Sequence, residues 1–161
     1  THDLGKAETP ADILPRHIGH EERSVRLTGR LCDRLRIPNE CRDLALLMAR
    51  YHGNIHRAAD LKASTIVTLF ENTDALRRPE RFRQLLDACL CDYTGRLGWE
   101  NRPYDSPAYL LAALATVNAV EAGKIAMACP DKTKIPERIH AARVRAVKQL
   151  LNEAGEQPEQ Q

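Results

Sequence analysis

The stretch Arg34–His56, RLRIPNECRDLALLMARYHGNIH, carries the clearest secondary-structure signal in the chain. Pro38 interrupts it, and Asn39 is a favourable N-cap for a helix that runs from Glu40 to about His52. Apolar residues recur at helical spacing and give this helix one apolar face, formed by Leu44, Leu47, Met48 and Tyr51. The Gly53-Asn54 pair then predicts the end of the helix.

Helical patterns continue on both sides of this stretch. Further helices are expected at Glu21–Arg36, from near Ser64, from about Pro79 to Tyr93, from Ser106-Pro107 to about Cys129, and from Pro136 to about Ala154. No segment alternates convincingly with period two, so the sequence predicts an all-α fold. We expect a helical domain over residues 1–98, a linker over 99–105, a helical tail over 106–154 and a disordered end over 155–161.

Composition limits the classes of protein that the chain can represent. At 161 residues it is long enough for one domain with a small appendage, and its net charge of +2 gives no whole-chain signature of nucleic-acid binding. No apolar run is long enough to span a bilayer. The five cysteines are odd in number and lie mostly in helical apolar patterns, which predicts reduced core thiols in a cytoplasmic protein.

The opening residues His2-Asp3-Leu4-Gly5-Lys6 place an imidazole, a carboxylate and a cation within one helical turn. Adjacent His and Asp side chains are able to hold a divalent ion, and the second carboxylate oxygen is then free to bridge or to orient a water. Gly5 permits a close turn, and Lys6 is then able to face an anion. The alternative is a helix C-terminus in which His2 and Lys6 complement the helix dipole.

Four further histidines occur in pairs. His17 and His20 are three residues apart and share a face if they are helical, whereas the alternative for both is a solvated loop. His52 and His56 have the i, i+4 spacing that chelates a metal from one helix face. The intervening Gly53-Asn54 argues against a continuous helix, which favours His56 as a surface residue.

The order of four motifs resembles the HD phosphohydrolase family: HDLGK at 2–6, PRHIGHE at 15–21, a helix that ends at His52, and CLCDYTGR at 89–96. More closely, the chain resembles the helical C-terminal portion of bacterial CCA-adding tRNA nucleotidyltransferases. The resemblance covers residues 1–98 and continues more weakly to the C-terminus. A lone acid at a helix end is most often an exposed cap, but the last motif matches the late Asp of the family at Asp92.

This resemblance implies an enzyme with a site of defined composition. It implies a divalent metal, Ni²⁺ or Mg²⁺, and hydrolysis of 2′,3′-cyclic phosphodiesters, 2′-nucleotides and phosphomonoesters. The expected catalytic residues are His2, Asp3 and Lys6, and the expected metal ligands are His2, Asp3, His20, His52 and Asp92. The expected phosphate contacts of the same site are Arg16, His17 and Arg96.

The resemblance also implies a larger parent protein, which would add C, C and A to tRNA 3′ ends with CTP, ATP and Mg²⁺. The first histidine of an HD domain comes from an upstream helix, and neither that residue nor a nucleotidyltransferase head is recognisable here. The chain is therefore expected to be a fragment, and the missing helix is expected to expose apolar surface at the N-terminus and to favour self-association.

The last predicted helix carries a basic stripe. Arg138, Arg145 and Lys148 fall opposite its apolar arc and are candidate contacts to a tRNA backbone, although a solvated face is the commoner explanation of such a stripe. The alternative function is therefore a non-catalytic tRNA-binding helical module of the same parent. Arg143 falls inside the apolar arc, so we expect it to be partly buried and paired with an acid.

Overall fold

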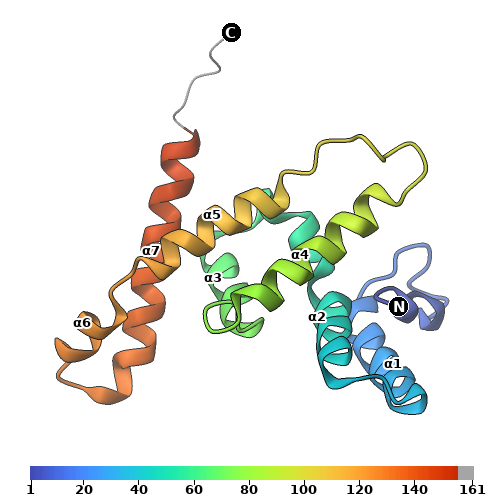
Figure 1. The fold of residues 1–161 in the computed structure, drawn as a ribbon, viewed down its shortest axis with the longest axis horizontal. Coiled ribbons are helices and arrows are strands. Elements are labelled where there is room, and N and C mark those ends of the chain that lie inside the picture. The colour runs from blue at the N-terminus through green and yellow to red at the C-terminus, as the bar shows by residue number, and fades with distance from the viewer. Residues whose placement is uncertain (156–161) are drawn as a thin grey trace, which may run out of the picture. The chain divides into compact units, whose positions relative to one another are not determined.

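The computed structural model describes residues 1–155 and confirms the predicted all-α fold, because every regular element in that range is a helix (Figure 1). The elements are η1 (Leu4–Glu8), α1 (His20–Leu35), α2 (Asn39–His56), η2 (Ala58–Asp60), α3 (Ala63–Asn72), α4 (Pro79–Thr94), α5 (Ser106–Asn118), α6 (Ala122–Met127), η3 (Lys132–Lys134) and α7 (Ile135–Gly155). The predicted disordered end lies outside the described residues from position 156 onward. Within residues 1–155, no helix combines the length and the apolar character that a membrane span requires.

The chain forms two compact units that are not contiguous in sequence. Unit 1 comprises Thr1–Arg57 and Glu80–Tyr104, and unit 2 comprises Ala58–Pro79 together with the chain from Asp105 onward. Residues 99–105 connect α4 to α5 without regular structure, at the place of the expected linker. The division of the sequence into functional domains at that linker stays a prediction.

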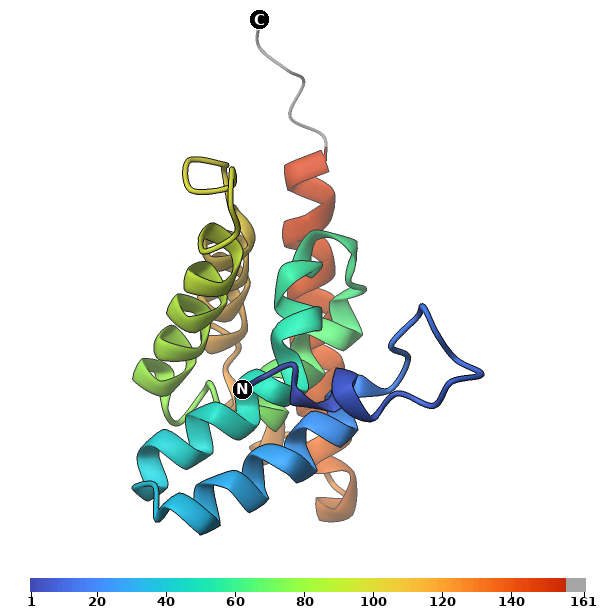
Figure 2. The ribbon, with the colours of Figure 1, turned by 90° about the vertical axis from the view of Figure 1, so that its right-hand side faces the viewer.

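In unit 1, α1 and α2 lie side by side, and η1 packs on α1 (Figures 1 and 2). The most buried stripe of α1 is formed by Ser24, Thr28 and Cys32, which follow one another at intervals of four residues. Leu35, the last residue of α1, is 56% exposed. The small Ser24 side chain lets the backbone of η1 approach α1, since its Oγ accepts from the Gly5 N–H.

Helix α2 is longer than predicted, because it continues through Gly53-Asn54 to His56. Glycine costs about 1 kcal/mol in a helix interior relative to alanine, and asparagine costs less. Burial offsets this cost, since Ile55 is fully buried and His52 is nearly so. His52 and His56 therefore lie one helical turn apart on a continuous helix, contrary to the predicted break.

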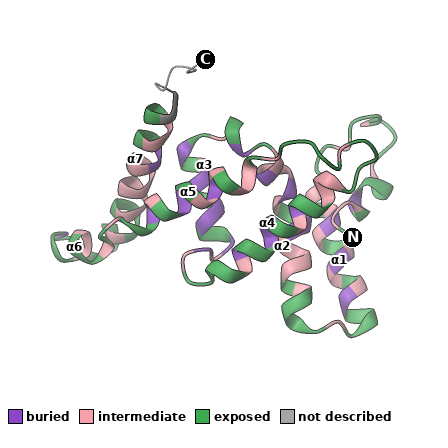
Figure 3. Cartoon of the chain, turned by 45° about the horizontal axis from the view of Figure 1, so that its top comes forward, coloured by how far each residue is buried: buried purple, intermediate pink, exposed green. Residues whose placement is uncertain are grey.

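Helix α4 follows its predicted bounds closely. Phe82, Leu85, Leu86 and Cys89 are buried, whereas Leu90 is exposed. Figure 3 shows buried and exposed positions along the helices. The Cys89 thiol donates to Met48 Sδ at 3.4 Å, and burial raises its pKa to about 12. All five cysteines are free thiols, but Cys41 and Cys91 are exposed, so the expectation of core thiols holds for only three of them.

Unit 2 is built on α3, α5 and α7, which pack against one another, and on α6, which packs on α7. Its buried side chains include Ile66, Phe70, Leu110, Val117 and Val147. Arg143 of α7 is partly buried and pairs with Glu71 of α3 at 3.4 Å, which confirms the expectation for this residue. Glu71 also accepts from His140 Nδ1 at 2.9 Å.

The helix predicted from Ser106 to Cys129 is two helices. Helix α5 ends at Asn118, and α6 begins at Ala122. Asn118 has low helix propensity and Gly123 has lower still, so little opposes a break between them. Pro107 occupies the first turn of α5 as predicted, but the N-cap is Asp105, one residue before the expected Ser106.

Candidate metal centre

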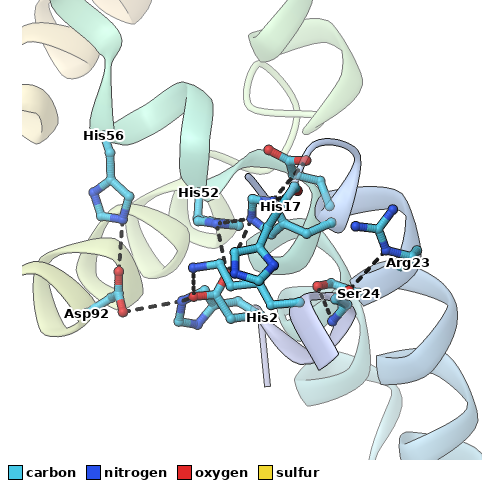
Figure 4. A network of polar contacts seen from close by, with 12 residues as sticks. His2, His17, Arg23, Ser24, His52, His56 and Asp92 are labelled. Carbon is cyan, nitrogen blue, oxygen red and sulfur yellow. Dashed lines mark hydrogen bonds and ion pairs between the residues drawn. The ribbon is translucent and has the colours of Figure 1, made fainter. Parts of the chain in front are cut away.

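The HDLGK segment is fixed on α1 by its glycine. The Gly5 N–H donates to Ser24 Oγ at 2.9 Å, and Arg23 Nε donates to the Gly5 carbonyl at 3.0 Å (Figure 4). A Cβ atom at Gly5 would lie 2.2 Å from the His20 carbonyl oxygen and 2.5 Å from the Ser24 amide nitrogen. Only glycine fits at this distance, and the close approach brings the preceding Asp3 to the first turn of α1.

The carboxylate of Asp3 lies at the centre of the histidine cluster. Its Oδ1 atom is 3.3 Å from His20 Nε2 and 3.6 Å from His52 Nε2. Its Oδ2 atom is 3.4 Å from His2 Nε2 and 2.6 Å from Lys6 Nζ. Asp3 thus faces imidazoles from three parts of unit 1: its own segment, the start of α1 and the C-terminal half of α2.

Backbone hydrogen bonds fix the tautomers of two of these imidazoles. His20 Nδ1 lies 2.9 Å from the His17 carbonyl, and His52 Nδ1 lies 3.0 Å from the Met48 carbonyl. Since a carbonyl oxygen only accepts, each Nδ1 carries the hydrogen, and in the neutral rings each Nε2 presents a lone pair. The two Nε2 atoms are 3.3 Å apart, so the two lone pairs face each other.

These lone pairs converge with a third electron-pair donor. Asp3 Oδ1 is buried and finds no hydrogen-bond partner among the described residues. Three acceptors within 3.3–3.6 Å of one another require either an additional proton on one ring or a cation between them. The tautomers of His20 and His52 fit a bound metal ion, because a metal takes imidazole nitrogens in this lone-pair state.

A second donor set shares Asp3. Asp92 of α4 points its Oδ1 to His2 Nε2 at 3.3 Å, so His2 lies between two carboxylates (Figure 4). The expected ligands therefore fall into two groups, His20 with His52 around Asp3 Oδ1, and His2 with Asp92 around Asp3 Oδ2. His2, Asp3 and His52 each offer a ligand atom within 4.8 Å of the others.

The protonation states suit metal binding at neutral pH. Burial lowers the pKa of His2 although Asp92 and Asp3 act in the opposite direction. Burial opposes ionisation of Asp3, but the Lys6 hydrogen bond and the charges of Lys6 and His2 outweigh it, and its pKa is lowered. The pKa of Asp92 is lowered in the same way, where His2 and Arg96 outweigh burial. Neutral imidazole and ionised carboxylate are the forms that ligate metals.

The other expected site residues take different positions. His17 pairs with Thr9 Oγ1 at 2.8 Å, so its ring is held by the loop before α1. Arg96 donates to Asp92 Oδ2 at 3.1 Å, and Arg16 is exposed on the same loop as His17. The stripe residues belong to unit 2 and are exposed on α7: Arg138, Arg145 and Lys148.

His56 joins the site although its sequence context predicted a surface position. Its side chain is only 17% exposed, and its Nε2 lies 3.0 Å from Asp92 Oδ2. Its Nδ1 lies 2.9 Å from the hydroxyl of Tyr104. The i, i+4 spacing to His52 was the sequence signal that favoured a site position for His56. We set it aside because Gly53-Asn54 predicted the end of the helix.

An all-helical domain that brings an adjacent His-Asp pair, further histidines and a late aspartate into one cluster is of the HD type. Comparison with known proteins specifies the family further. The chain is 86% identical over all of its 161 residues to the "Multifunctional CCA protein" of Dechloromonas aromatica (strain RCB), and it covers 39% of that protein. The whole chain is therefore homologous to a part of proteins that carry this name.

Other relatives of that name agree. The chain is 56% identical over 152 residues to the protein of Burkholderia cenocepacia (strain HI2424), covering 94% of this chain and 37% of the relative. It is 56% identical over 155 residues to that of Paraburkholderia phymatum, covering 96% and 37%. The chain thus spans about two fifths of the length of these curated relatives. No family model and no solved structure matches it.

Proposed function

We propose that unit 1 is a metal-dependent phosphohydrolase of the HD type. One observation carries the proposal: the buried Asp3 Oδ1 has no hydrogen-bond partner among the described residues, and the lone pairs of His20 and His52 are aimed at it. A buried acceptor without a donor costs about 1–3 kcal/mol, so a fold keeps such an arrangement where a ligand completes it.

The positions of the site residues suggest two roles, metal ligation and phosphate contact. His2, Asp3, His20, His52 and Asp92 would hold the ion, which would supply Lewis acidity toward a phosphoryl oxygen and a water of lowered pKa. Lys6 and Arg96 already neutralise the two carboxylates. Both cations extend to partly exposed positions and would contact the phosphate of a bound substrate, with Arg16 and His17 as further contacts from the loop before α1.

The donor set bears on the choice of metal. Imidazole nitrogens suit Ni²⁺, whereas Mg²⁺ prefers oxygen ligands and retains several waters. Three imidazoles and two carboxylates therefore favour Ni²⁺ over Mg²⁺ at this site. The substrates that we propose are 2′,3′-cyclic phosphodiesters, 2′-nucleotides and phosphomonoesters.

The parent protein would carry a second activity. The names of the relatives support a role in CCA addition, in which a cytoplasmic nucleotidyltransferase adds C, C and A to the 3′ end of tRNA with CTP, ATP and Mg²⁺. In that protein the present chain would supply the phosphohydrolase and a part of the surface that holds tRNA.

A tRNA-binding module without catalysis is the second candidate. The observation that favours it is the stripe Arg138, Arg145 and Lys148, which is exposed on α7 and thus available to a phosphate backbone. Under this proposal the chain binds tRNA with a steep salt dependence, and substitution of the stripe by glutamine weakens binding without affecting metal affinity.

The sequence also predicts self-association near the N-terminus. Leu4 is 37% exposed and joins Leu27 and Leu31 in lining a groove of about 680 Å³ between η1 and α1. We propose that this groove buries apolar surface of a second copy. Sedimentation that shows a monomer at all concentrations would contradict this proposal.

Hydrolysis of 2′,3′-cyclic AMP tests the main proposal directly. Turnover is measured with added Ni²⁺, with added Mg²⁺ and with a chelator, for the unsubstituted chain and for Asp3→Ala. Asp87→Ala serves as the control, since Asp87 is exposed on the same helix as Asp92. Metal-dependent turnover that is lost only in Asp3→Ala supports the phosphohydrolase. Absent turnover in a folded, metal-loaded chain favours the tRNA-binding module.

A further inference from the structure

The imidazole of His56 joins two residues that lie far from it in sequence. Its Nε2 is 3.0 Å from Asp92 Oδ2, and its Nδ1 is 2.9 Å from the Tyr104 hydroxyl. The other oxygen of Asp92, Oδ1, lies 3.3 Å from His2 Nε2. Figure 4 shows these two contacts of Asp92, to His56 and to His2, as dashed lines. A continuous series of polar side-chain contacts thus runs from Tyr104, in the loop after α4, to His2 in the HDLGK segment.

The chemistry of Asp92 decides which atom donates and which accepts in each of these hydrogen bonds. The Asp92 carboxylate, which also accepts from Arg96, only accepts hydrogen bonds, so His56 donates through its Nε2–H. In the neutral ring, Nδ1 then holds a lone pair and accepts from the Tyr104 O–H. Tyr104 therefore selects the tautomer in which His56 is a donor to Asp92.

The ring of Tyr104 is itself held in place. It stacks on Tyr93 with ring centroids 4.4 Å apart, and Tyr93 contacts Trp99 edge to face at 4.9 Å. Arg102 lies over the Trp99 ring at 4.5 Å. Because these contacts depend on the aromatic faces, a phenylalanine at position 104 retains the stack and removes only the hydroxyl.

We infer that His56 is a positioning residue, which holds Asp92 with its free oxygen toward His2 while Tyr104 keeps the His56 ring in the donor tautomer. The inference rests on the proposed role of Asp92 as a metal ligand. His56 is not itself placed as a ligand, because Asp92 and Tyr104 are the hydrogen-bond partners of its two ring nitrogens. Partners of this kind orient metal-ligating groups in many metalloproteins.

A first test needs no metal. In the metal-free, nitrogen-15-labelled chain, two-bond proton–nitrogen spectra are expected to show His56 with hydrogen on Nε2, with His56→Gln identifying its signals. Tyr104→Phe is expected to shift the His56 Nδ1 resonance, whereas Tyr109→Phe, a matched change on α5, leaves it in place. Hydrogen on Nδ1, or no shift in Tyr104→Phe, would overturn the inference whether or not the chain binds metal.

A second test measures Ni²⁺ affinity by calorimetry and bound nickel by mass spectrometry, with circular dichroism as the check on folding. His56→Leu is expected to weaken binding by about ten- to a hundredfold with unchanged stoichiometry, as for other outer partners. His56→Gln, which retains a donor near the Nε2 position, is expected to restore most of the affinity. Equal losses in both variants with less bound nickel would identify His56 as a ligand instead. No loss in His56→Leu would equally contradict positioning.

Failure of the proposed function gives a different result. If the unsubstituted chain binds no nickel, the metal centre itself fails, whereas the tautomer of His56 still decides whether Tyr104 and His56 act as a unit on Asp92.

Discussion

Each unit contains a cluster of histidine and carboxylate, and the two clusters differ in whether donors reach the carboxylate oxygens, although Arg143 Nε of unit 2 is itself a buried donor without a partner among the described residues. In unit 2, Glu71 accepts from His140 Nδ1 at 2.9 Å and lies 3.4 Å from Arg143 Nη1, so donors supply both oxygens. In unit 1, Asp3 Oδ1 has no hydrogen-bond donor among the described residues and faces the Nε2 atoms of His20 and His52. The first cluster holds two helices together, and the second converges on a carboxylate oxygen that no described donor satisfies.

The difference shows that residue types alone do not distinguish a structural cluster from a binding site. Both clusters use helices, histidines and an acid at similar distances. What separates them is whether donors reach the carboxylate, because a carboxylate oxygen that accepts from a donor stabilises the fold and a convergent set of acceptors costs free energy until a ligand or a proton binds. Matched changes in the two clusters would test this distinction.

The largest expected effect is that of Asp3→Asn on metal binding. The substitution keeps the size of the side chain and removes the charge that both donor groups share. We expect Ni²⁺ affinity to fall by more than roughly a hundredfold, the upper range for loss of an outer partner alone. Calorimetric titration measures it, with the isosteric Glu71→Gln as the control that leaves affinity unchanged. Equal affinity losses in the two variants would remove the distinction between the clusters.

Gly5→Ala tests how the incomplete cluster is assembled. The added Cβ would lie 2.2 Å from the His20 carbonyl oxygen and 2.5 Å from the Ser24 amide nitrogen, and these backbone atoms cannot move without shifting α1. Overpacking of this kind costs about 1–3 kcal/mol or more. We expect the free energy of unfolding of unit 1 to fall by that amount, measured by urea titration of the fluorescence of Trp99, the single tryptophan.

Gly29→Ala is the matched control for Gly5→Ala. Gly29 lies on the same helix as Ser24, and a Cβ atom added there would meet only a Leu46 methyl at 3.9 Å, an ordinary contact. Alanine at this position is expected to raise stability by about 0.5–1 kcal/mol. Destabilisation in both variants would indicate that α1 tolerates no added methyl group, and the close approach of η1 would lose its special role.

Much of the fold could be predicted from the sequence, because helical spacing is a local property. The predicted bounds of α4 and α7 agree with the structure within about one residue, and Arg143 was correctly expected to pair with an acid inside an apolar arc. The break between α5 and α6 was missed, since the Ala-rich pattern continues across it. The continuation of α2 was missed because tertiary burial of Ile55 outweighs the local cost of Gly53-Asn54.

The candidate site was predictable only in part. The motif order identified His2, Asp3, His20, His52 and Asp92, and the structure brings all five together. The sequence could not show that backbone carbonyls fix the tautomers of His20 and His52, because that depends on how each ring is turned. It also gave no reason to connect Tyr104 with His56, which lies 48 positions away in sequence.

A smaller effect is expected when the Glu71 cluster of unit 2 is broken. Glu71→Ala leaves Arg143 and His140 without their acceptor, and since all three side chains are partly exposed we expect a loss of about 1 kcal/mol. Hydrogen exchange of α7 measures it. Adding Arg143→Met to Glu71→Ala is expected to restore part of the loss, because no unpaired charge then remains. A drop in Ni²⁺ affinity in Glu71→Ala would contradict the separation of the two clusters.

The smallest expected effect is the pH dependence of unit 1 without metal. Burial lowers the pKa values of His2 and His56 from the ordinary 6.5, although Asp92 acts in the opposite direction on both. Below pH 6.5 the unfolded state therefore binds more protons than the folded state, so the free energy of unfolding falls as the pH is lowered. The lowered pKa values of Asp3 and Asp92 continue the same trend in more acidic solution.

Urea titrations of Trp99 fluorescence between about pH 7.5 and about pH 5.5 would measure this slope in the chelator-treated chain. His56→Gln removes one of the two imidazoles whose pKa is lowered and is expected to flatten the slope. Saturating Ni²⁺ is expected to steepen it, because protons then compete with the metal for the same nitrogens. Stability that rises on acidification would mean that the folded cluster of unit 1 takes up a proton, and the two clusters would then differ in protonation and not in metal binding.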